Sequence, residues 1–113
     1  MHEYSIVSSL LERVAAEARA RNATAVHRLT VRIGAAAGVE PELLSKAYEL
    51  FRAGTICAGA ELCVERVAER WACPGCGQTL ERGEVLSCGR CGMPARLVSG
   101  DEIILERIEM EVP

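Results

Sequence analysis

The sequence predicts an α+β fold in which two helices cover a three-stranded sheet and a small four-cysteine subdomain is inserted before the last strand. Three observations predict this fold: two segments with helical spacing of apolar residues, three segments that alternate as strands do, and two Cys-x-x-Cys pairs late in the chain. We place the main domain at residues 1–70 and 99–113 and the inserted subdomain at residues 71–98.

Each predicted helix has an apolar stripe and recognisable ends. The first runs from about Glu3 to Arg21, and Asn22 after it suits the left-handed conformation that often ends a helix. The second begins at Pro41, because proline is favoured in the first helical turn, and it ends before Gly54. Its predicted buried stripe consists of Leu43, Leu44, Ala47, Tyr48 and Phe51.

Three segments have the alternation of strands, at residues 25–33, 61–67 and 102–112. The apolar face of the first segment consists of Leu29, Val31 and Ile33. Its polar face consists of Arg28, Thr30 and Arg32. The last strand has apolar residues on both faces in its first half. Ile104 lies on one face and Ile103 and Leu105 lie on the other, so we expect the first half of this strand to be covered on both sides.

The cysteine segment predicts a structural zinc site. Cys73-Pro-Gly-Cys76 and Cys88-Gly-Arg-Cys91 are separated by eleven residues, and a glycine follows each pair. Four such thiolates can bind Zn²⁺ tetrahedrally with no open position, and the glycines allow tight turns with positive φ. The alternatives are disulfides, a redox motif, which normally occurs once in a chain, or a rubredoxin-like iron site with the same ligands. We expect a zinc-ribbon-like subdomain.

Composition limits the classes of partner that the protein can bind and indicates its cellular compartment. The chain has 113 residues and a formal charge of −3, which is unsuited to nucleic acid. It has no apolar run near the roughly 18 residues that cross a bilayer, and no secretory signal opens it. Paired cysteines without a signal favour the reducing cytoplasm. Because no acid–base pair or phosphate-binding loop is evident, we do not expect an enzyme.

The first three residues form a second candidate metal site. The α-amine of Met1, the backbone nitrogen of His2 and the His2 imidazole can chelate one ion. Planar nitrogen ligands suit Ni(II) or Cu(II) better than zinc, and Glu3 can add an oxygen ligand or a hydrogen-bond acceptor. Taken alone, however, a histidine in second position is usually an ordinary terminal residue, and an acid is favoured in the first turn of any helix.

Three other residues with metal-binding side chains are not expected to be ligands. His27 is a lone histidine at the start of a strand, without converging donors. Cys57 and Cys63 lie outside the pairs, and we expect them to act as small, half-buried apolar residues.

Several segments taken together resemble the HypA/HybF family, nickel metallochaperones that help to mature [NiFe]-hydrogenase. The resemblance spans essentially the whole chain and rests on five segments in the same order. They are MHEYSIVSSLLERV, the V-x-I-G strand end, GVEPELL, the CPGCG…CGRCG insert and SGDEIILERIEMEV. The spacer between the cysteine pairs is shorter than is usual in the family, but the four ligands are all present.

The resemblance implies a nickel-binding α+β domain with an attached zinc domain. Its nickel ligands would be Met1, His2 and Glu3, and Glu40 occupies the position of an acidic residue near nickel in the family. Its zinc ligands would be Cys73, Cys76, Cys88 and Cys91.

The resemblance also implies partners. They are a HypB-type GTPase, the large subunit of a [NiFe]-hydrogenase as the recipient of nickel, and urease maturation proteins as a further destination. The alternative function is that of a zinc-ribbon protein-binding module without a role in nickel delivery.

Overall fold

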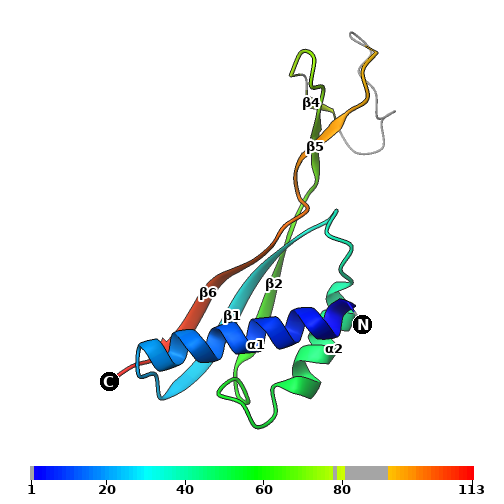
Figure 1. Cartoon of the computed structure of the whole chain (residues 1–113). Helices are drawn as coiled ribbons and strands as arrows, with labels where there is room; N and C mark the ends of the chain where they lie inside the picture. Colours follow the sequence, from blue (N-terminus) through cyan, green and yellow to red (C-terminus); the bar gives the residue numbers. More distant parts are fainter. Residues whose placement is uncertain (1, 78, 81–91) are drawn as a thin grey trace. The chain divides into compact units, whose positions relative to one another are not determined.

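The computed structural model describes residues 2–77, 79, 80 and 92–113, with the backbone alone at His2 and Leu80. The expected elements are α1 (His2–Ala20), β1 (Ala25–Gly34), α2 (Pro41–Phe51), β2 (Glu61–Val67) and β6 (Ile103–Glu111) (Figure 1). Three short strands that were not predicted are β3 (Arg70–Ala72), β4 (Thr79–Leu80) and β5 (Arg96–Ser99). Among the described residues, no helix has the length and hydropathy to cross a bilayer.

The chain divides into two compact units. The first consists of Met1–Arg32, Val39–Glu65 and Ile104–Pro113, and the second of Ile33–Gly38 and Arg66–Ile103. The second unit therefore includes the loop after β1, a segment outside the predicted insert of 71–98.

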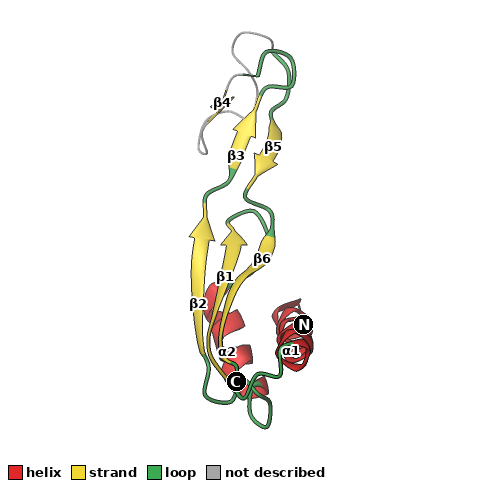
Figure 2. Cartoon of the chain, turned by 90° about the vertical axis from the view of Figure 1, so that its left-hand side faces the viewer, coloured by secondary structure: helices red, strands yellow, loops and turns green. Residues whose placement is uncertain are grey.

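The larger sheet has the strand order β2-β1-β6. β1 and β2 point the same way, as strands joined through a helix do, and β6 runs in the opposite direction (Figure 2). At the ends of the β1–β6 pair, Thr24 N–H donates to the carbonyl of Glu111 and Gly34 N–H to that of Glu102. The predicted fold class, two helices on a three-stranded sheet, is confirmed.

The core of the first unit lies between the two helices and one face of this sheet. Its buried side chains from α1, β1 and α2 include Val7, Val14, Leu29, Val31, Leu44, Ala47 and Tyr48. The predicted stripe of α2 is wrong at Leu43 and Phe51, which are 51% and 39% exposed. The buried stripe, which consists of Leu44, Ala47 and Tyr48, is narrower than predicted because neighbouring elements cover only one side of the helix. Phe51 instead packs edge-to-face on Tyr4 of α1, with 5.1 Å between ring centroids.

Two details of the strands differ from expectation. In β1 the alternation of burial changes phase after Val26, so that His27 and Arg28 are both exposed. In β6 the prediction of cover on both sides is wrong, because Ile103 and Ile104 are 39% and 41% exposed. β6 is an edge strand, and edge strands are covered less completely than central ones.

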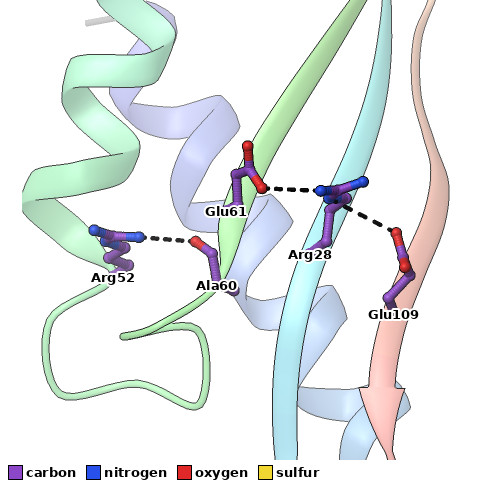
Figure 3. Close-up of polar contacts among 5 residues, drawn as sticks. All are labelled: Arg28, Arg52, Ala60, Glu61 and Glu109. Atoms are coloured by element: carbon purple, nitrogen blue, oxygen red, sulfur yellow. Dashed lines mark hydrogen bonds and ion pairs between the residues drawn. The ribbon is translucent and has the colours of Figure 1, made fainter.

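The second face of the larger sheet carries charged side chains. Arg28 on the central strand donates from its NH2 group to Glu61 Oε2 of β2 at 3.1 Å, and its Nε lies 3.9 Å from Glu109 Oε2 of β6 (Figure 3). The hydrogen bond and charge of Glu61 raise the pKa of Arg28, and Glu109 acts in the same direction. Because these groups are exposed to water, the pairs contribute little to stability.

Candidate metal centres

The first cysteine pair forms a tight turn directly after β3. Cys73 is buried and Cys76 is exposed. Within the turn, Gly75 N–H donates to Cys73 Sγ at 3.3 Å, and Gly77 N–H donates to the carbonyl of Cys73 at 2.8 Å. An amide that donates to a cysteine sulfur stabilises the thiolate, which is the form that binds metal.

The glycines after the two pairs adopt the conformation that their positions require. Gly77 follows Cys76 with φ of 76°, and Gly92 follows the second pair with φ of 67°. No atom lies within 4 Å of a Cβ added at either glycine, so the conformation alone favours glycine there. The predicted positive φ at these turns is confirmed. Cys88 and Cys91 themselves lie outside the described residues.

The first pair is anchored to a small sheet with the strand order β4-β3-β5. On β3, Trp71 lies opposite Leu80 of β4 and Leu97 of β5, and its indole Nε1 is buried without a hydrogen-bond partner. Two thiols in one tight turn and an amide that donates to one of them fit a thiolate-bound metal.

The structure brings two of the predicted nickel ligands together. Glu3 lies in the first turn of α1, and Glu40 directly precedes α2. The backbone N–H of Glu40 donates to Glu3 Oε2 at 3.3 Å, a contact between residues 37 positions apart. The backbone of Glu40 is extended, with φ −86° and ψ 112°, and its side chain does not cap α2.

Part of each predicted ligand set lies outside the described atoms. For nickel these are Met1 and the imidazole of His2, and for zinc they are the second pair of cysteines. The described residues by themselves contain no group of three His, Cys, Asp or Glu side chains that could hold a metal ion. They contain the Glu3 carboxylate beside the backbone of Glu40, and, separately in the sequence, the first pair of thiols.

The remaining histidine and cysteines lie elsewhere. The His27 side chain is 58% exposed, and its Nε2 lies 3.2 Å from Glu111 Oε1 at the surface. Cys57 is fully buried, and burial raises the pKa of its thiol. Cys63 is half-buried on β2.

Comparison with known proteins points to one family. The sequence model of the family described as HypA, a hydrogenase/urease nickel incorporation metallochaperone, matches residues 1–110. Two relatives, each called hydrogenase maturation factor HypA, come from Aquifex aeolicus and Wolinella succinogenes, and both are 40% identical over 114 residues. The alignments cover 99% of this chain and 99% of the first relative, and 98% of this chain and 96% of the second.

Solved structures agree with the sequence comparison. The solution structure of the Ni metallochaperone HypA from Helicobacter pylori has a TM-score of 0.73 and 26% identity, and the match covers 98% of both chains. A second solution structure, of a HypA protein, has a TM-score of 0.77 and 28% identity over 97% of this chain and 96% of that one.

Proposed function

The chain belongs to the HypA family of nickel-incorporation metallochaperones that act in hydrogenase maturation, and from this premise we propose that it binds Ni(II) at its amino terminus. The observation that carries the proposal is the hydrogen bond from Glu40 N–H to the Glu3 carboxylate. It brings the first turn of α1 and the residue before α2 together, so that two acidic residues lie close to each other, one of them next to His2 in the sequence.

In this proposal the ligands are the α-amine of Met1, the backbone nitrogen and imidazole of His2, and an oxygen from Glu3 or Glu40. Such a set is rich in nitrogen and suits the planar coordination that Ni(II) favours. A site at the end of a chain also leaves one side of the ion open. An incoming ligand from a partner can therefore displace the protein's ligands one at a time, which is what delivery requires.

We propose that Cys73, Cys76, Cys88 and Cys91 bind a structural Zn²⁺. The turn geometry of the first pair supports this proposal, because Gly75 already directs an N–H at the Cys73 sulfur. Four thiolates fill a tetrahedral shell, so the metal would supply folding energy to the second unit and no catalysis. We accordingly propose no enzymatic activity for the chain.

The proposed partners follow from the family. They are a HypB-type GTPase that assists delivery and the large subunit of a [NiFe]-hydrogenase that receives nickel. Urease maturation is a second proposed destination, in line with the wording of the family description.

Nickel titration of the untagged chain, beside a version extended at its amino terminus, tests the proposal. Both should contain one zinc per chain, because the extension lies far along the sequence from the cysteines. Only the chain with a free α-amine should bind one nickel with high affinity. Equal nickel binding by both versions would contradict the terminal site. Zinc without any nickel binding would instead favour a zinc-ribbon protein-binding module.

A further inference from the structure

Trp71 is the only tryptophan of the chain. Its ring is half-buried, and Nε1 is the only buried side-chain nitrogen or oxygen without a hydrogen bond in the part of the chain that the structure describes. Leaving such a donor unsatisfied is destabilising, and buried tryptophan N–H groups normally find a partner. The indole N–H is therefore a buried donor that can form a further hydrogen bond.

Trp71 lies in the strand that leads directly into the cysteine turn. Trp71 lies on β3, the central strand of its sheet, and the pairing with β5 shifts register between Arg70 and Trp71. Irregularities of this kind are common beside functional sites, where they change the direction of a side chain. Cys73 lies one residue beyond the end of β3, and continuing the alternation of the strand would bring its side chain to the face that Trp71 occupies.

Cys73 offers the acceptor that Trp71 lacks. Its side chain is 1% exposed, and its sulfur already accepts one N–H, from Gly75. A neutral thiol is a weak acceptor. A thiolate on a divalent metal retains negative charge, however, and accepts charge-assisted hydrogen bonds from more than one donor.

We propose that the indole N–H of Trp71 donates a hydrogen bond to the metal-bound sulfur of Cys73. Trp71 is then a positioning residue of the zinc site, because it orients a ligand and stabilises its charge without touching the metal. The inference rests on the zinc part of the proposed function. It goes beyond the four ligands by assigning a role to a residue outside the two Cys-x-x-Cys pairs.

The test uses the full chain labelled with ¹⁵N and loaded with ¹¹³Cd, which binds thiolates as zinc does and is visible to NMR. A single tryptophan gives a single indole N–H signal, so its assignment is unambiguous. We expect a scalar coupling between the indole proton and ¹¹³Cd, transmitted through the hydrogen bond and the sulfur. We also expect a nuclear Overhauser effect between that proton and the β-protons of Cys73. A tryptophan that only packs would show no coupling to the metal.

Variants provide a second readout. Trp71→Phe keeps an aromatic ring but removes the donor, and it should weaken zinc binding about tenfold in competition with a chelator. Leu97→Ala is the matched control, because Leu97 faces Trp71 across the strand pair and contributes packing without a donor. We expect its zinc affinity to change less, and its indole proton should remain coupled to ¹¹³Cd.

Metal content distinguishes a failure of the proposed role of Trp71 from a failure of the proposed zinc site. One bound zinc or cadmium per chain, with no coupling and an indole signal unchanged by metal, would overturn the role of Trp71 and leave the zinc site intact. A chain that binds neither metal would overturn the proposed zinc site, and the role of Trp71 with it.

Discussion

The backbone N–H of Glu40 donates to the carboxylate of Glu3, and this bond joins the first turn of α1 to the residue before α2. Both helices begin here, and the amino-terminal end of a helix carries a partial positive charge that favours carboxylates. Because the side chain of Glu40 is not used as a cap for α2, its carboxylate is available for another role. The fold thus places the Glu3 carboxylate beside the backbone of Glu40, where we propose the nickel site.

His2→Ala should abolish high-affinity nickel binding and leave zinc content and fold unaltered. The change removes the imidazole and breaks the chelate, whereas the cysteine turn is remote in sequence. The measurement is calorimetric titration of the untagged variant with Ni(II).

His27→Ala is the matched control for this variant, because His27 is the only other histidine of the chain. Its exposed side chain pairs with Glu111, and its loss should leave nickel affinity unchanged. Retention of nickel affinity in His2→Ala would contradict the terminal site.

Glu40→Ala should lower nickel affinity by about tenfold or more if its carboxylate is a ligand or supports one. The variant keeps the backbone N–H that binds Glu3, so the position of Glu3 should persist. Glu42→Ala, an exposed acid in the first turn of α2, controls for the loss of one negative charge. Equal affinities of the two variants in the same titration would remove Glu40 from the site.

The elements of this fold were predictable where one face of a long segment is apolar. β2 has the predicted limits, Glu61–Val67, and Asn22 has the expected left-handed conformation, with φ of 53°. The helix stripe of α2 was predicted too wide because spacing alone cannot show how much of a helix its neighbours cover. The strands β3 to β5 escaped prediction because two to four residues are too few to show a period.

The candidate sites were predictable to different degrees. Cysteine spacing indicated the tight turn of the first pair directly, because the two thiols of a pair are local in sequence. The proximity of Glu3 and Glu40 depends on how two helices pack, and no local pattern encodes it. The unpaired indole N–H of Trp71 likewise becomes visible only when burial is known.

Cys76→Ser should remove zinc from the chain and destabilise the second unit, while the helices and larger sheet remain folded. A serine hydroxyl does not replace a thiolate ligand, and metal binding is the main source of folding energy in small zinc modules. Metal analysis together with the NMR signals of α1 and β1 would check both parts. Cys63→Ser, outside the pairs and half-buried, should keep its zinc. Full zinc content in Cys76→Ser would refute the four-thiolate site.

Gly34→Ala should destabilise the second unit by about 2–3 kcal/mol. A Cβ at position 34 would lie 2.0 Å from the carbonyl oxygen of Gly100, so backbone must move. The movement would also strain the hydrogen bond from Ala36 N–H to Gly100. Gly59→Ala is the control, since nothing lies within 4 Å of its added Cβ. Urea denaturation should show a lower midpoint for the first variant only, and equal midpoints would contradict this close approach.

Tyr48 should make the stability of the first unit depend on pH above about 10. Its hydroxyl is buried and donates to the carbonyl of Ala60 at 2.8 Å. Burial raises the pKa of Tyr48 to about 12, whereas an unfolded tyrosine titrates near pH 10. The folded state therefore holds the proton more tightly. The stability that this provides is fully present below about pH 10 and is lost as pH rises towards 12.

Tyr48→Phe separates this titration from other alkaline effects. At neutral pH the variant should lose only about 1 kcal/mol, because Arg52 still donates to the Ala60 carbonyl (Figure 3). Between about pH 10 and 12 its free energy of unfolding should fall less steeply than that of the parent chain. Tyr4→Phe, at the other and exposed tyrosine, should keep the parent's slope. The measurement is urea denaturation across this pH range. If Tyr48→Phe also kept the parent's slope, the buried hydroxyl would not be the group responsible. The thiol of Cys57, whose pKa is also raised by burial, would then be the next candidate.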